Sequence, residues 1–249
     1  MTVVSHNRLK CAALFVGLFL IAGGRYAPSV SGQEKLPGQR SEGGHGQDAD
    51  TVSLQERILP QANPTAYEFG ASLAQVTSAI QKAYEKHFWE TGDQVKQAGG
   101  NQDPPFNALL IWGDKADGCA LCQGVFDKPE NRNDACLFGG AHPFGRSKVY
   151  FKNGLPLLYF ADFHIHLTAT SASKTRIEIF TNNPWVSAGL DESSLLGPAY
   201  IAVDVKPTTI EEYEILLKIG EQLGVKGMPR LVVPGPDSPT QQVVRPRKG

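Results

Sequence analysis

Three cysteines and one histidine in the middle of the chain have side-chain types and a spacing that could do chemistry. They are Cys119, Cys122, Cys136 and His142, arranged as C-x2-C-x13-C-x5-H. Three thiolates and an imidazole can hold zinc in a tetrahedron, and the close spacing of the first two lets both reach one ion. The same cysteines could instead provide a redox dithiol, or one structural disulfide with a spare thiol. The pattern alone leaves these three interpretations open.

A second group of candidate residues lies on a predicted strand. Asp162, His164 and His166 alternate with apolar residues, so their side chains should project from one face of the strand. Two imidazoles in this arrangement could share one metal ion, with Asp162 or Glu178 as an oxygen ligand or as an acceptor behind a ligand. A metal ion held there could activate water for hydrolysis. The alternative is a solvated polar face on which Asp162 balances the two histidines.

The N-terminus predicts that the protein is exported. Arg8 and Lys10 precede an unbroken apolar run at residues 11–24, which is shorter than the about 20 residues of a membrane-spanning helix. This order is typical of a signal peptide, which we place at residues 1–32. We therefore expect a periplasmic, cell-envelope or secreted protein, with membrane contact only through an uncleaved leader.

Export changes the interpretation of the cysteines. Oxidising compartments convert neighbouring thiols to disulfides, so we favour a disulfide from Cys136 to either Cys119 or Cys122 over a zinc site. Three cysteines cannot all pair with one another, so one thiol would be left over. No cofactor is predicted on this basis, and zinc remains the candidate metal.

Composition divides the mature chain into a linker, one domain and a tail. Residues 33–64 are rich in Gly, Gln, Ser and charged residues, which predicts a disordered linker. Residues 65–233 have the size of a single domain, and residues 234–249 are expected to form a flexible tail. The net charge of −1 offers no basic face for nucleic acid. We expect no nucleic-acid partner, and instead an unidentified protein or small-molecule ligand in the envelope.

Two helices are predicted at opposite ends of this domain. A capping box, in which Ser or Thr is followed three residues later by Gln or Glu, begins at Ser72 and again at Thr208. Apolar residues at helical spacing follow each box. We therefore predict helices over about 72–89 and about 209–223.

Between the helices the apolar residues alternate with polar ones, as in a half-buried sheet. Residues 148–181 contain an Asn153-Gly154 turn and predict antiparallel hairpins. One long strand should turn a continuous apolar set to the core: Leu157, Tyr159, Ala161, Phe163, Ile165 and Leu167. The returning strand should place Thr175, Ile177 and Ile179 on the same side. Alternation on one face favours an α+β domain, an antiparallel sheet with the two capped helices packed on its apolar face.

Short, separated segments resemble parts of thioredoxin-like proteins. A predicted strand at residues 108–112 runs toward the C-x-x-C pair, and the stretch from a strand at residues 200–205 to Pro229 resembles the segment whose cis-proline lies beside the dithiol. The resemblance implies an alternative fold, thioredoxin-like with a β insertion. It also implies a thiol-disulfide oxidoreductase in which Cys119 attacks, Cys122 resolves and Pro229 contacts the substrate.

Motifs of other enzyme classes are absent from the sequence. It contains no G-x-S-x-G elbow, H-E-x-x-H helix, P-loop or dinucleotide fingerprint. We therefore expect a non-enzymatic binding or structural module of the periplasm or cell envelope, without excluding an enzyme. The alternatives are a thiol-disulfide oxidoreductase using Cys119 and Cys122, and a metal-binding protein or metal-dependent hydrolase using His164 and His166.

Overall fold

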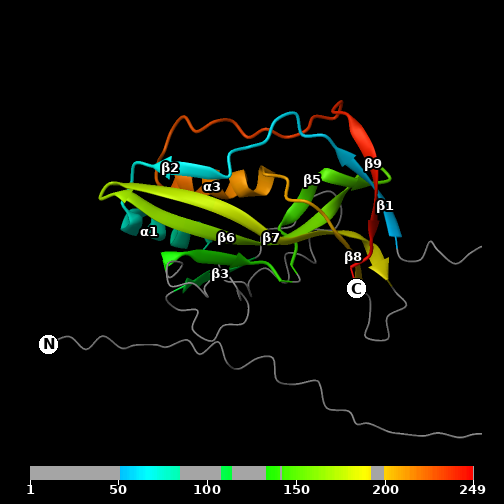
Figure 1. Cartoon of the computed structure of the whole chain (residues 1–249), viewed down its shortest axis with the longest axis horizontal. Coiled ribbons are helices and arrows are strands. Elements are labelled where there is room, and N and C mark those ends of the chain that lie inside the picture. Colours follow the sequence, from blue (N-terminus) through cyan, green and yellow to red (C-terminus); the bar gives the residue numbers. More distant parts are fainter. Residues whose placement is uncertain (1–50, 85–107, 114–132, 141, 192–198, 249) are drawn as a thin grey trace, which may run out of the picture. The chain divides into compact units, whose positions relative to one another are not determined.

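A long antiparallel hairpin forms the centre of the structure (Figure 1). The computed structural model describes residues 51–84, 108–113, 133–140, 142–191 and 199–248. All of these residues belong to one unit, Asp50–Gly249. The predicted signal peptide and nearly all of the predicted linker lie outside the described residues.

The described residues form nine strands and two helices. The strands are β1 (Thr51–Arg57), β2 (Ala66–Phe69), β3 (Leu109–Trp112), β4 (Ala135–Phe138), β5 (Gly145–Lys152), β6 (Leu155–Ser171), β7 (Lys174–Asp191), β8 (Ala199–Asp204) and β9 (Thr240–Pro246). The helices are α1 (Leu73–Tyr84) and α3 (Ile210–Gln222). Along the main path the strand order is β2-β7-β6-β5-β1-β9, while β4 joins β6, β3 joins β4 and β8 joins β7.

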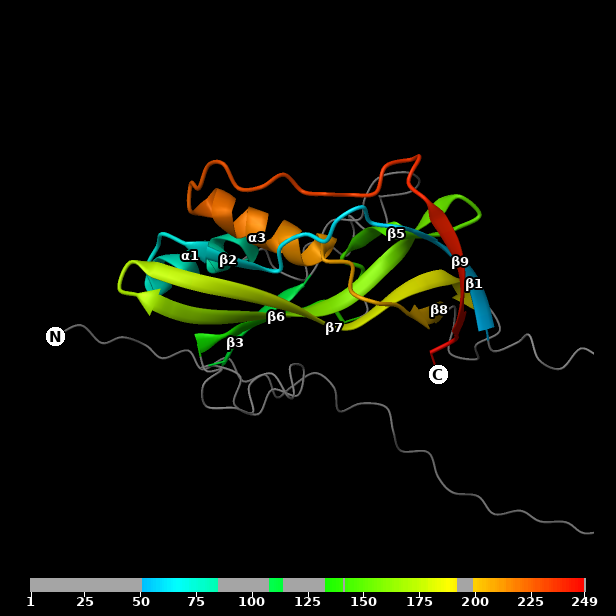
Figure 2. The same cartoon turned by 45° about the horizontal axis from the view of Figure 1, so that its top comes forward.

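Strands β6 and β7 are long enough to pair with different strands at their two ends. Strand β6 pairs with β5 through its first residues and with β4 from Phe163 to Ile165. Strand β7 pairs with β2 near its start and with β8 near its end. The ladder between the two shifts register between Phe160 and Asp162, and such irregularities increase the local twist. The sheet is therefore curled, and Figure 2 shows both helices along one side of the hairpin.

The apolar face of the sheet forms the core, as the alternation predicts. All six core positions of β6 are buried, and so are Thr175, Ile177 and Ile179 on β7. Helix α1 contributes Val76 and Ile80 to this core. Helix α3 contributes a larger buried set: Ile210, Tyr213, Ile215, Leu216 and Ile219. The predicted α+β architecture is confirmed, with both helices packed against an antiparallel sheet.

The first capping box is confirmed, whereas the second helix begins differently. The backbone N–H of Ser72 donates to Gln75 Oε1 at 2.9 Å, and the N–H of Gln75 donates back to Ser72 Oγ at 3.4 Å. At the second helix, Thr209 has a φ of 66° and occupies the cap position. The hydroxyl of Thr208 therefore accepts from the N–H of Ile210 at 3.2 Å and contacts the Glu211 carboxylate. It does not complete a reciprocal box.

Two strands lie in segments that the sequence analysis assigned to the linker and to the tail. Strand β1 pairs along its whole length with β9, from Thr51 opposite Pro246 to Arg57 opposite Thr240. Val52 and Leu54 are buried by this arrangement. Only two apolar residues of β1 face the core. Two such residues in a polar segment are too few for the alternation pattern to predict a strand. The ordered unit thus extends beyond the predicted limits of 65 and 233.

The thioredoxin-like alternative does not describe these residues. Thioredoxin-like proteins carry C-x-x-C beside a βαβ pattern, whose strands are parallel, whereas all strand pairs in the described part of the chain are antiparallel. The residues around Pro229 form no strand, and the Pro229 carbonyl instead accepts a hydrogen bond from the hydroxyl of Tyr213 at 2.7 Å. The described residues contain no cis peptide bond. Neither of the two helices described is long and apolar enough to cross a membrane.

Glu211 is a buried carboxyl group at the start of α3, with only 2% of its surface exposed. Burial raises the pKa of Glu211 to about 7, although the hydrogen bond from Thr208 acts in the opposite direction. Glu211 therefore binds its proton more tightly in the folded protein than in the unfolded chain. The folded state should lose stability as pH rises from the ordinary carboxyl pKa of 4.5 through 7.

We predict that Glu211→Gln removes this pH dependence. At pH 8 the variant should be more stable than the parent by about 3 kcal/mol, because each pKa unit corresponds to about 1.4 kcal/mol. At pH 4 the two should be equal. Urea denaturation from pH 4 to pH 8 measures the difference, with Glu214→Gln on the half-exposed side of the helix as the control. A constant difference across this pH range would contradict the prediction.

Candidate metal centre

The pairing of β4 with β6 brings a carboxylate to the two predicted histidines. Asp134 directly precedes β4, and its carbonyl accepts a hydrogen bond from the N–H of Gly113 at 2.9 Å. In the β4–β6 ladder, Cys136 lies opposite His164. Residues opposite each other share a face of the sheet, and so do residues two apart on a strand. Asp134 therefore lies on the polar face of β6, beside His164 and His166.

One oxygen atom of Asp134 contacts both histidines. The distance from His164 Nε2 to Asp134 Oδ2 is 2.7 Å, and the distance from His166 Nδ1 to the same oxygen is 2.8 Å. The second oxygen, Oδ1, accepts a hydrogen bond from the backbone N–H of Leu167 at 3.0 Å. The Asp134 side chain is 0% exposed, whereas those of His164 and His166 are 15% and 28% exposed. The carboxylate is thus enclosed, and the site is reached from solvent past the imidazoles.

The three hydrogen bonds keep the buried carboxyl ionised. Burial by itself raises the pKa of Asp134, because it disfavours the charged form. The hydrogen bonds from His164, His166 and the N–H of Leu167 outweigh burial, and the pKa lies below its usual value. An ionised carboxylate with two nitrogen atoms around it is a hydrogen-bonded cluster whose donor atoms could also hold a metal ion.

A neighbouring hydroxyl holds the outer nitrogen of His166. Thr168 Oγ1 lies 3.2 Å from His166 Nε2. If Nε2 carries the proton and donates it to this hydroxyl, Nδ1 keeps its lone pair for a metal ion, which is the usual arrangement behind ligating histidines. The ring of His164 packs near that of Phe180, with 5.7 Å between ring centres. Contacts on the same sheet face therefore orient both imidazoles.

The donor atoms are close enough to bind one ion together. One ligand atom from each of Asp134, His164 and His166 lies within 4.8 Å of the others. Two imidazole nitrogens and one carboxylate oxygen form a ligand set suited to zinc and to other first-row divalent metals. Three protein ligands leave at least one coordination position open.

Asp162, the expected oxygen ligand, is not part of this group. Its Oδ1 accepts a hydrogen bond from the backbone N–H of Gly139 at 2.9 Å. Burial raises the pKa of Asp162 in spite of the hydrogen bonds from Gly139 and Gly140. Glu178, the other expected acceptor, forms an ion pair with Arg176 at 2.9 Å. Both carboxylates are thus engaged elsewhere, while Asp134 meets the histidines.

Asp134 is not among the metal-ligand candidates that the sequence pattern predicts. It ends a segment, residues 127–134, that is rich in charged residues and Asn and has the composition of a polar loop. The only local signal is its place directly before the apolar strand β4 (Ala135–Phe138). Which carboxylate meets the histidines depends on the register of β4 against β6, and sequence alternation does not determine that register.

Of the cysteine group, only Cys136 and His142 fall within the described residues. Cys119 and Cys122 lie outside them, so the zinc, dithiol and disulfide interpretations of this group stay predictions. Cys136 is buried on β4. His142 is half-buried in the turn before β5, where its N–H donates to the carbonyl of Gly139 at 3.0 Å.

Comparison of the chain with protein-family models, with curated proteins and with solved structures finds no match. The fold and the site therefore define the class of this protein by themselves. It is an α+β protein with a curled antiparallel sheet and an Asp/His/His group on the polar face of that sheet.

We predict that Asp134→Ala destabilises the metal-free protein by about 3 kcal/mol, because removing a buried acceptor leaves several donors unpaired. Asp134→Asn should cost less, since its amide oxygen still accepts from the N–H of Leu167. Asp237→Ala, on an exposed turn, is the control and should have no effect. Guanidinium denaturation in the presence of a chelator measures all three. A loss below about 0.5 kcal/mol for Asp134→Ala, the usual limit for surface changes, would contradict the structural role of this carboxylate.

Proposed function

We propose that this chain is an exported, non-enzymatic binding protein of the cell envelope whose ligand is one divalent transition-metal ion. The ion would be held by Asp134 Oδ2, His164 Nε2 and His166 Nδ1. The observation that carries the proposal is the convergence of these atoms, within 4.8 Å of one another, on a carboxylate enclosed by the protein. The basic and apolar N-terminal segment supports export.

The surroundings of the three atoms favour a metal site. The N–H of Leu167 fixes the carboxylate through Oδ1, and the hydroxyl of Thr168 contacts the outer nitrogen of His166. Partners of this kind orient ligands and strengthen metal binding. Two nitrogen ligands and one oxygen ligand match zinc, and by the usual affinity order copper(II) and nickel(II) would compete for the same atoms.

Metal binding requires only a small expansion of the group. Ligand atoms about 2.0–2.1 Å from a tetrahedral zinc ion lie about 3.3 Å from one another. The nitrogen atoms now lie 2.7 and 2.8 Å from Oδ2, so each ring must withdraw by a few tenths of an ångström. In each imidazole the proton that now faces Asp134 must be carried by the other ring nitrogen, so that the ligating nitrogen keeps its lone pair. Binding should weaken in acid, where both ring nitrogens are protonated.

For the cysteines, we propose one structural disulfide from Cys136 to Cys119 or Cys122. The burial of Cys136 supports this proposal, because buried cysteines are poor nucleophiles and poorly placed for thiol exchange. The disulfide would fasten the segment between β3 and β4, and thereby the approach of Asp134 to β6.

Calorimetric titration of the chelator-treated mature chain with zinc tests the metal proposal. We expect one ion per chain, with affinity lowered at least about 100-fold by His164→Ala, a loss larger than that from removing an outer-shell partner. His142→Ala is the matched control, because it removes a histidine of the cysteine group and should change nothing. Circular dichroism verifies that each metal-free variant is folded.

Two results would overturn the proposal. One is the absence of stoichiometric binding by zinc, copper(II), nickel(II), cobalt(II) and manganese(II) alike. The other is zinc binding that survives His164→Ala but is lost in His142→Ala or Cys122→Ser, which would assign the ion to the cysteine group.

A further inference from the structure

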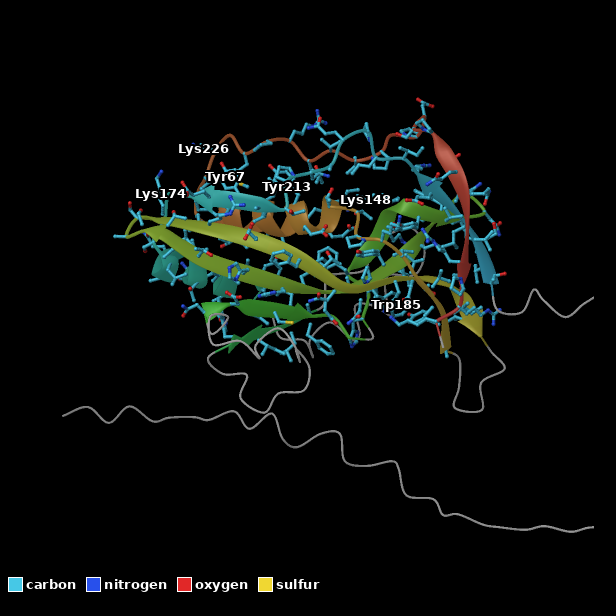
Figure 3. The ribbon with its side chains drawn as sticks, viewed as in Figure 1. Tyr67, Lys148, Lys174, Trp185, Tyr213 and Lys226 are labelled. Atoms are coloured by element: carbon cyan, nitrogen blue, oxygen red, sulfur yellow. The ribbon has the colours of Figure 1, made fainter. Side chains whose placement is uncertain are left out.

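A cavity of about 250 Å³ lies on the other side of the sheet, between β5, β6 and the two helices. Tyr159 of β6 lines it from the core face, whereas His164 and His166 project from the opposite face of the same strand. Figure 3 shows Lys148, another lining residue, where β5 approaches α3. The volume is slightly below the range of about 300–1,000 Å³ that is usual for small-molecule sites, so only a compact ligand would fit. Because Tyr159 and the two histidines project from opposite faces of β6, the cavity is separate from the metal centre.

Tyr159 is one of the residues that line this cavity, and its buried hydroxyl has no hydrogen-bond partner among the described residues. Tyr159 is 1% exposed, and an unpaired buried hydroxyl carries a free-energy cost that phenylalanine would avoid. Burial raises the pKa of Tyr159, with the Glu211 and Glu212 carboxyls acting in the same direction, so the group keeps its proton. A residue in the wall of the cavity therefore carries a buried hydrogen-bond donor that lacks an acceptor among the described residues.

Most of the charged side chains that line the cavity are cationic. Three cationic side chains line it, Arg146, Lys148 and Lys218, against two carboxyl groups, Glu211 and Glu214. Glu214 is already paired with Lys148, with 2.7 Å between Oε1 and Nζ. Because burial raises the pKa of Glu211 to about 7, this group is partly neutral at physiological pH and opposes an anion less than an ordinary carboxylate would.

Apolar side chains complete the wall. Phe144 and Ile215 line the cavity together with the ring of Tyr84. The ammonium of Lys218 lies 4.6 Å from the centre of that ring. A ligand that fits these surroundings has a compact apolar body and one anionic head that accepts hydrogen bonds.

We propose that this cavity binds a small organic monocarboxylate, whose carboxylate accepts a hydrogen bond from Tyr159 Oη and is attracted by Arg146, Lys148 and Lys218. The apolar body of the ligand packs against Phe144 and Ile215. This site goes beyond the proposed metal-binding function and does not depend on it, because the two use opposite faces of β6.

The mature chain, freed of metal by a chelator, is titrated with benzoate and hexanoate, and with the uncharged analogues benzamide and hexanol. We expect saturable binding of one or both carboxylates and at least tenfold weaker binding of the matching analogue. The proposal is overturned if neither carboxylate binds, or if acids and uncharged analogues bind alike.

The Tyr159→Phe variant tests whether the Tyr159 hydroxyl binds a ligand or whether the side chain only packs in the core. The variant should bind the carboxylate at least tenfold more weakly, and its ligand-free melting temperature should rise by about 2–4 °C because the unpaired hydroxyl is gone. Tyr150→Phe is the matched control: this tyrosine is as buried as Tyr159, but its hydroxyl donates a hydrogen bond to the carbonyl of Lys206 at 3.2 Å. The control should melt lower than the parent and bind the carboxylate unchanged.

Lys218→Gln gives a second measurement at the rim, where the substitution removes charge but leaves the core intact. It should weaken carboxylate binding severalfold and leave benzamide binding unchanged. Parent-like carboxylate affinity in both Tyr159→Phe and Lys218→Gln would overturn the proposal.

Discussion

Strand β6 has two different faces, and the rest of the structure depends on the register that keeps them apart. Its odd-numbered positions from Leu157 to Leu167 form the core, while Asp162, His164 and His166 lie on the polar face. A slip of one residue in its pairing would bury the histidines and expose the core residues. The free energy of burying the apolar set therefore also fixes where the imidazoles project. The packing of the core thereby positions the candidate metal centre.

Sequence patterns predicted the features that are local. Alternation identified both faces of β6, and the capping box at Ser72 formed as expected. Features that depend on distant pairing were not predictable in this way. Strand β1 forms by pairing with β9 and β5, both distant in the sequence, and Asp134 reaches the histidines through the β4–β6 ladder. Local propensity carries no information about either partner.

The two candidate sites differ in how their buried polar groups are satisfied. The Asp134 carboxylate accepts hydrogen bonds from three donors, so the cluster also stabilises the fold when no ion is bound. The Tyr159 hydroxyl has no partner in the described part of the chain, and the fold gains nothing from it. A paired group can serve structure and ligand binding together, whereas an unpaired one points more directly to a ligand. This contrast explains why variants at the two sites are expected to change stability in opposite directions.

Anomalous X-ray scattering at the zinc edge, from crystals of the zinc-loaded mature protein, would locate the bound ion directly. We expect one strong peak on the polar face of β6, with His164 Nε2, His166 Nδ1 and Asp134 Oδ2 each about 2.0–2.2 Å from the ion. A peak bound by cysteine sulfur, at about 2.3 Å, would contradict it. So would zinc-loaded crystals in which Asp134 still accepts hydrogen bonds from both imidazoles and no peak lies near them.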